Sequence, residues 1–137
     1  MTSLTMISPA GHGLTMTEFH TSFDGVTSSA VPVYVEALQS TQAVAGTATA
    51  ATPIQVRGRA TGGSAPTGGS NYTVINTVLT SAFAILVPAF NGVYTYQFPL
   101  GREIECDSSA GTIKALGLAV TAPAAVNTRQ YLETENL

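Results

Sequence analysis

Two histidines and a glutamate lie close together near the start of the chain and are its first candidates for chemistry. They are His12, Glu18 and His20, and the chain has no other histidine. Imidazole and carboxylate groups are common zinc ligands, and Glu18 and His20 would share one face of a strand. Their spacing matches no established zinc pattern, and a further ligand would have to come from elsewhere. We therefore favour an ordinary hairpin or arm here and leave a metal site open.

A second group of acids surrounds the single cysteine. Glu103, Glu105 and Asp107 occupy alternate positions, which would place three carboxylates on one face of a strand. Such a row could bind calcium together with backbone oxygens, or pair with an arginine of a neighbouring subunit. A solvent-facing strand side is favoured, because a calcium loop usually contains its own turn of Asp, Asn and Gly. Negatively charged neighbours raise the pKa of a thiol, so Cys106 is expected to be a buried packing residue rather than a nucleophile.

Signatures of covalent or nucleotide chemistry are missing from the sequence. No Gly-x-Ser-x-Gly motif occurs, and the segments around the two histidines show no catalytic pattern. The glycine-rich stretch from Gly58 to Asn71 lacks the Gly-Lys-Ser/Thr ending of a phosphate-binding loop. We predict that the protein is not an enzyme and uses no cofactor.

Charged side chains are scarce throughout the chain. They make up 9% of 137 residues, against roughly 25% in ordinary soluble domains, while 45% of residues are hydrophobic. Lys114 is the only lysine. A surface of Thr, Ser, Ala and Gly is easily buried against a neighbour, because little charge must be desolvated. The composition indicates a protein made to be assembled.

The same composition argues against several classes of partner and location. A net charge of −3 gives no basic surface for nucleic acid, and Arg57 and Arg59 are the only clustered cations. No cationic and apolar leader opens the sequence, and the longest apolar run, Ala82–Phe90, is too short for a membrane helix. One cysteine excludes an internal disulfide. We expect no nucleic acid, no membrane and synthesis in the cytosol.

Residue types and alternation predict an all-β fold. Thr, Val, Ile, Tyr and Phe are abundant, and several runs alternate with the period of a strand. We predict one antiparallel β-sandwich or jelly-roll-like domain of about eight short strands. The candidate strands are Leu4–Ile7, Leu14–Phe19, Ala30–Glu36, Thr52–Arg57, Tyr72–Leu79, Ala82–Val87, Val93–Phe98, Glu103–Cys106 and Thr112–Thr121.

Turn signals and faces refine this prediction. Asn91-Gly92 is a two-residue hairpin signal, and the segment from Asp107 to Gly111 is typical of a longer hairpin loop. Two strands should each present an apolar face, made of Tyr94, Tyr96 and Phe98 in one and Leu116, Leu118 and Val120 in the other.

The chain divides into a central domain and two terminal arms. We expect an N-terminal arm over residues 1–13, a β domain over 14–122 with a glycine-rich loop at 58–71, and a C-terminal arm over 123–137. Val35–Val44 is the one helix-like stretch, and the C-terminal arm could hold a short helix or stay extended.

Residues expected at interfaces come from the arms and from the few charged clusters. Apolar residues have little reason to exist on free tails, and sparse charges can fix the register of a contact. The candidates are Leu4, Met6, Ile7, Arg57, Arg59, Glu103, Glu105, Asp107, Arg129, Tyr131 and Leu132.

The C-terminal part of the chain also resembles a known class of virion proteins. The stretch Tyr94–Asp107, followed by Ile113–Val120, resembles small β-rich accessory proteins of tailed-phage virions, above all the capsid decoration (cement) proteins. The resemblance implies a jelly-roll or sandwich on the outer capsid at symmetry axes, clamping neighbouring major capsid proteins. It carries no functional residue over by position.

Together these observations predict a structural virion component, most specifically a capsid decoration protein. Its partners would be the major capsid protein or other virion subunits, with self-association as a dimer or trimer. It would be made in the host cytoplasm and reside on the capsid surface. The alternatives are another phage part, such as a head–tail joining, tail-tube or fibre-base protein, or a ligand-binding β-sandwich module.

Overall fold

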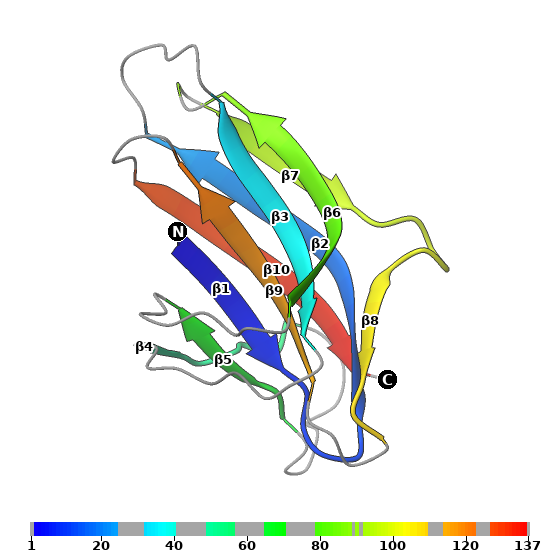
Figure 1. Cartoon of the computed structure of the whole chain (residues 1–137). Coiled ribbons are helices and arrows are strands. Elements are labelled where there is room, and N and C mark those ends of the chain that lie inside the picture. Colours follow the sequence, from blue (N-terminus) through cyan, green and yellow to red (C-terminus); the bar gives the residue numbers. More distant parts are fainter. Residues whose placement is uncertain are drawn as a thin grey trace.

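Every regular element of the computed structural model is a strand, and the strands form two sheets (Figure 1). The structure describes residues 2–24, 32–40, 49–56, 65–70, 79–88, 90, 92–109, 114–122 and 127–136. Ten strands lie in these ranges, all paired antiparallel, with no helix among the described residues. The predicted all-β sandwich is confirmed.

The larger sheet has six strands in the order β4-β5-β1-β9-β3-β6. The N-terminal strand lies inside this sheet, because β1 pairs with β5 on one side and with β9 on the other. The six strands are β1 (Thr2–Ile7), β3 (Val33–Ser40), β4 (Thr49–Ala51), β5 (Thr67–Ser70), β6 (Leu79–Val87) and β9 (Ala115–Thr121).

The smaller sheet has four strands arranged around its longest one. Strand β2 pairs with β10 along one side and with β8 and then β7 along the other. Its members are β2 (Gly13–Phe23), β7 (Val93–Gln97), β8 (Ile104–Asp107) and β10 (Thr128–Asn136).

A β-bulge at Thr17 divides β2 into two halves. Glu18 pairs with Glu133 and Met16 with Thr134, so Thr17 is the extra residue. The bulge reverses the alternation of β2, and apolar side chains of both halves therefore point inward. Strand β2 changes its pairing partner from β8 to β7 at the same place. There the Thr17 carbonyl accepts a hydrogen bond from the Phe98 N–H at 2.9 Å.

The core lies between the sheets and is continuous along their length. Alternate residues of β3 and β9 face it, as do both halves of β2. The predicted faces of β7 and β9 both contact this core. Its fully buried members are Leu14, Met16, Phe19, Val33, Val35, Ala37, Leu116, Leu118 and Val120.

An aromatic cluster closes the core beside the edge strands β6 and β7. Phe19 lies at its centre, with the rings of Phe83, Tyr94, Tyr96 and Phe98 all centred 5.9–6.1 Å from it. Stacked and edge-to-face rings add to the free energy gained by burial alone. The cluster links the two sheets where β6 of one lies opposite β7 of the other.

At the other end of the sandwich, a hydrogen-bonded cluster of buried polar groups joins two turns. The Ser8 hydroxyl and the Ser108 N–H both donate to the His12 carbonyl, at 2.8 and 2.9 Å. The Ser108 hydroxyl accepts from the Lys114 N–H at 3.0 Å, and Gly11 turns the chain at φ 78°. This cluster provides hydrogen-bond partners for backbone groups that the turns would otherwise leave unpaired.

The expected terminal arms are corrected by the structure, because both ends of the chain are strands. Met6 and Leu132 pack against the core rather than projecting from it. The Thr134 hydroxyl donates to the Met6 sulfur at 2.8 Å, so β10 also contacts β1 across the layers. Pairing with a neighbouring strand satisfies backbone groups that a free arm would leave to water.

The expected glycine-rich loop is also corrected in part. Its second Thr-Gly-Gly-Ser unit, Thr67–Ser70, is strand β5 and pairs with both β1 and β4. Glycine suits this position because a Cβ on Gly68 would lie 2.7 Å from the Ala51 carbonyl oxygen. The first unit, Thr61–Ser64, lies outside the described residues, as does most of the strand expected over Tyr72–Leu79.

Both predicted hairpins are wrong as strand pairs. Strand β6 belongs to the larger sheet and β7 to the smaller, so the connection through Gly92 crosses between layers; Asn91 itself lies outside the described residues. Strands β8 and β9 are likewise in different sheets. The helix-like stretch is strand β3 as far as Ser40, and β4 lies just before the strand expected at 52–57. Core packing of β3 overrides its weak helical pattern.

We expect the Thr21→Val variant to be more stable than the unsubstituted protein. Thr21 is fully buried on the inner face of β2, and its hydroxyl has no hydrogen-bond partner among the described residues. Valine keeps the shape and removes the unpaired hydroxyl, which should raise the free energy of unfolding in urea by about 1 kcal/mol. Thr121→Val, at an exposed position of β9, is the matched control and should change stability by less than about 0.5 kcal/mol. A destabilised Thr21→Val variant would contradict this description of the core.

Candidate functional site

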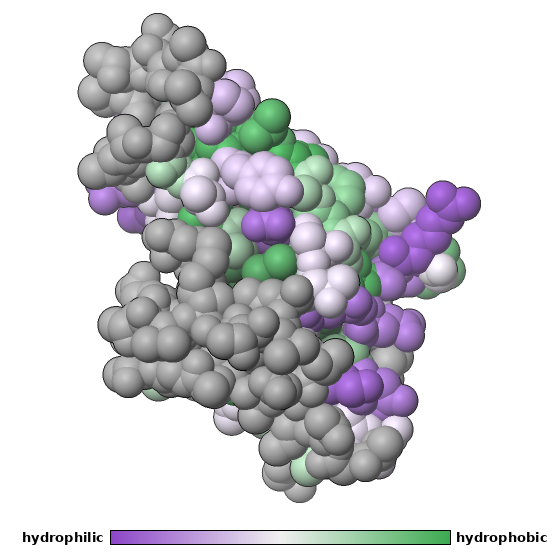
Figure 2. All heavy atoms as spheres, in the orientation of Figure 1, coloured by the Kyte–Doolittle hydropathy of each residue, from purple (hydrophilic) through white to green (hydrophobic). Residues whose placement is uncertain are grey.

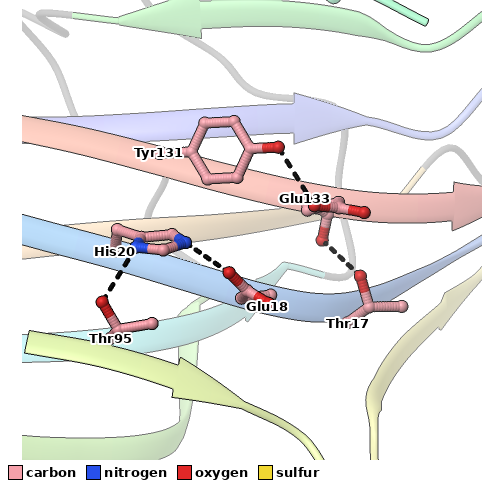
Figure 3. A network of polar contacts seen from close by, with 6 residues as sticks. All are labelled: Thr17, Glu18, His20, Thr95, Tyr131 and Glu133. Carbon is pink, nitrogen blue, oxygen red and sulfur yellow. Dashed lines mark hydrogen bonds and ion pairs between the residues drawn. The ribbon is translucent and has the colours of Figure 1, made fainter. Parts of the chain in front are cut away.

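The most connected polar side chains lie on the outer face of the smaller sheet (Figure 3). Cross-strand register places His20 of β2 opposite Tyr131 of β10 on one side and Thr95 of β7 on the other. Glu18 lies on the same strand face as His20, as the alternation of β2 predicted. Two residues further along β10, Glu133 lies opposite Glu18.

His20 is held at both of its ring nitrogens. Its Nε2 contacts Glu18 Oε1 at a short distance, and its Nδ1 lies 2.9 Å from Thr95 Oγ1. The edge of one ring meets the face of the other between His20 and Tyr131, with centroids 5.2 Å apart. These contacts fix the position of an imidazole whose side chain is 40% exposed.

The two carboxylates beside His20 are each paired. The Tyr131 hydroxyl donates to Glu133 Oε2 at 3.0 Å. Partial desolvation, followed by this hydrogen bond and the charges of Glu133 and Glu18, raises the pKa of Tyr131 above its ordinary value. Like charges directly opposite each other destabilise a strand pair, and contacts to His20 and Tyr131 offset that repulsion.

The order hydroxyl, imidazole, carboxylate is that of a nucleophile with its base and orienting acid. If Nε2–H donates to Glu18, the Thr95 hydroxyl donates to Nδ1. An acyl-transfer site also needs donors for a developing oxyanion. Strand β2 pairs on both sides here, so its N–H groups are used within the sheet. The arrangement therefore favours a rigid polar surface over nucleophilic catalysis.

The two metal sites left open by the sequence are not assembled by the described residues. No three His, Cys, Asp or Glu side chains among them come together in a group that could hold an ion. His12 lies in the turn before β2, where its N–H donates to the Pro9 carbonyl at 3.2 Å.

The acidic row follows the alternation expected for β8. Glu105 and Asp107 are exposed while Ile104 and Cys106 are buried. Asp107 accepts a hydrogen bond from the Ser109 N–H at 2.8 Å, and hydrogen bonds from the side chain and backbone of Ser109 lower the pKa of Asp107. Its carboxylate therefore caps a turn. The Glu105 carbonyl accepts from the Gln39 side chain at 2.6 Å, which links β8 to β3.

The residues predicted for interfaces fall into different environments. Leu4, Met6 and Leu132 pack in or against the domain's own core, which corrects their assignment to projecting arms. Ile7 is half-buried on β1, while Arg129 and Tyr131 are exposed on β10. Glu103 precedes β8 and is half-buried, and Arg57 and Arg59 lie outside the described residues.

Sequence reasoning did not find Thr95 as a partner of His20 or Tyr131 as its neighbour. Alternation shows which residues share a face of one strand, but it does not show which strands are adjacent. The order β10-β2-β7 brings together residues that are 75 or more positions apart.

Comparison with protein-family models, curated proteins and solved structures finds no match for this chain. Among the described residues there is also no helix long and apolar enough to cross a bilayer.

We expect His20 and Glu18 to be energetically coupled. A double-mutant cycle with His20→Gln and Glu18→Gln should give a favourable coupling of about 0.5 kcal/mol in urea unfolding, because partly exposed pairs contribute little. The matched control pairs His20→Gln with Glu135→Gln, further along β10, and should show no coupling beyond error. Zero coupling in the first cycle would contradict the contact.

Cys106 should react slowly with iodoacetamide in the folded protein. Burial is the main reason that its thiol pKa is raised, so less thiolate is present at a given pH. At about pH 8, alkylation of the folded protein should be much slower than alkylation of the protein unfolded in urea, as followed by mass spectrometry. A Cys106→Ala variant carrying Leu100→Cys provides an exposed thiol for comparison, since Leu100 is 97% exposed. Equal rates at the two positions would show that Cys106 is accessible.

Proposed function

We propose that this protein is a structural virion component, a capsid decoration or cement protein that binds and stabilises the shell of the major capsid protein. It would act without catalysis on the capsid surface after synthesis in the host cytoplasm. The observation that supports this most is the unequal distribution of charge between the two sheets.

The six strands of the larger sheet contain a single charged residue, Glu36. The four strands of the smaller sheet contain six, namely Glu18, Glu105, Asp107, Arg129, Glu133 and Glu135. Desolvating charge is costly, so a neutral sheet can be buried against a partner at less cost than a charged one. The charged sheet is suited to remain in water.

Large apolar side chains are exposed on the neutral sheet as well. Tyr34 of β3 is 39% exposed and Leu86 of β6 is 64% exposed. In Figure 2, apolar and weakly polar residues cover most of the described surface over β3 and β6, with one strongly hydrophilic patch among them, while other strongly hydrophilic residues lie mainly toward the right-hand margin. Aromatic residues on a face with little charge are typical of the centre of an interface.

A ligand-binding module is the less supported reading. The aromatic residues that could stack on a ligand are used in packing, since Tyr96 stacks on Phe83 at 4.7 Å and Phe98 is buried. Assembly remains the function that the described surface supports best.

Two tyrosines of similar exposure provide the test. Tyr34 lies on the larger sheet and Tyr131, which is 43% exposed, on the smaller. After incubation with shells of the parent virus that lack the protein, hydroxyl-radical footprinting should show Tyr34 protected and Tyr131 unchanged. Tyr34→Lys should abolish co-sedimentation with the shells, and Tyr131→Lys should retain it.

Failure of the unsubstituted chain to bind shells would contradict a capsid role. Binding to purified tails instead would identify another virion part. Protection of Tyr131 with Tyr34 still reactive would show that the charged sheet is the docking face, contrary to the proposal.

A further inference from the structure

The described sheets end in edge strands that differ in how well they are guarded against pairing. Strand β4 has three residues, and β10 carries Arg129, Glu133 and Glu135. Strand β8 carries Glu105 and Asp107, and β7 has only five residues. Short length and charge are the usual means by which proteins protect sheet edges.

Strand β6 has neither protection. It is nine residues long, contains no charged residue and pairs with β3 on one side only among the described strands. In Figure 1 it forms the margin of the larger sheet. A long, uncharged edge presents a row of unpaired N–H and C=O groups to any strand of matching character.

The apolar half of β6 pairs with β3 without interruption, and a bulge and a proline limit it at its two ends. Ala37 pairs with Phe83 and Leu38 with Ser81, so Ala82 is an extra residue that interrupts the ladder. From Phe83 the pairing runs without a break to Val87, and Pro88 follows. Proline lacks an N–H group and ends the segment available for pairing.

Both faces of this segment are incompletely covered. Phe83 and Ile85 point toward the core but remain half-buried, and Phe83 stacks on Tyr96. Ala84 and Leu86 point outward and are exposed. A strand added beside β6 would cover the first pair and extend the outer face next to the second.

We propose that a second copy of this chain pairs with this edge, antiparallel, through the segment Phe83–Val87 and about a two-fold axis at Ile85. Phe83 then lies opposite Val87 of the other copy, and Ala84 lies opposite its Leu86. The two larger sheets become one continuous sheet. This deepens the proposed function by naming the surface through which copies meet.

The absence of charge is what selects a second copy as the occupant. A two-fold axis brings the same short segment of both copies together, so a charge on that segment would lie near the same charge of the other copy. Neither β6 nor the edge strand β7 of the other sheet contains one, and Glu36 lies one strand further from the axis, on β3 opposite Ala84. The added strand also places apolar side chains beside Phe83 and Ile85, where water now reaches them.

The test uses the isolated chain, so its failure and the failure of the virion proposal are separate results. Sedimentation equilibrium should give a dimer mass for the unsubstituted protein. The Ala84→Lys/Leu86→Lys variant should have half that mass, because four ammonium groups would meet near the axis, and Glu36 of each copy, opposite position 84, could neutralise only two of them. Both positions are exposed, and circular dichroism checks that the variant keeps its β fold.

Ile54→Lys is the matched control. Ile54 is 85% exposed and follows β4, at the opposite end of the same sheet, so this variant should remain dimeric. A monomeric or trimeric unsubstituted protein would overturn the proposal, as would a folded double-lysine variant that stays dimeric.

If the double variant does not fold, hydrogen exchange on the unsubstituted protein tests whether β6 pairs with a second copy. Amides in Phe83–Val87 should become better protected as protein concentration rises, while those of Thr49–Ala51 in β4 stay the same. Protection of β6 that does not depend on concentration would overturn the proposal.

Discussion

The bulge at Thr17 is the constraint on which the rest of the sandwich depends. Strand β2 is the only strand that joins the three others of its sheet. Without the extra residue, a strict alternation could not point Leu14 and Met16 inward together with Phe19 and Phe23. The bulge also marks where β2 changes its partner from β8 to β7, and the Phe98 N–H satisfies the Thr17 carbonyl there. The inward faces of both halves of β2 and the placement of His20 on the outer face follow from this one residue.

The distribution of charge gives the two sheets different surfaces. Residues such as Glu18, His20 and Glu133 form a partly exposed polar network on the smaller sheet, in which His20 contacts Glu18 and Tyr131 donates to Glu133. The larger sheet has almost no charge and exposes Tyr34 and Leu86. The outer face with little charge and the uncharged edge at β6 belong to the same sheet. The two proposed contacts are therefore compatible, because a shell would use the outer face and a second copy would use the edge.

Local pattern was a good guide wherever a strand has a simple alternation. The faces of β7 and β9 were predicted residue by residue, and Glu105 and Asp107 share the exposed side of β8 as expected. The pairing of Glu18 with His20 also follows from the period of a strand. The candidate strand Leu4–Ile7 is confirmed as part of β1, although it was assigned to an arm. Pattern failed at the C-terminus and at Thr67–Ser70, because small or polar residues give no periodic signal, although neighbouring strands make them part of a sheet.

The sequence by itself determined that the chain is all-β, poor in charge and without a recognisable catalytic motif. Those properties depend on residue types and on short-range alternation, which need no knowledge of neighbours. Only the tertiary structure decided that the N-terminal strand lies inside a sheet, that the C-terminal segment is a strand, that the connection through Gly92 joins two sheets and that Thr95 reaches His20. Strand order depends on contacts between distant residues, such as Met6 and Thr134, which are 128 positions apart. Shape complementarity across the core selects those pairings, and a period of two cannot encode it.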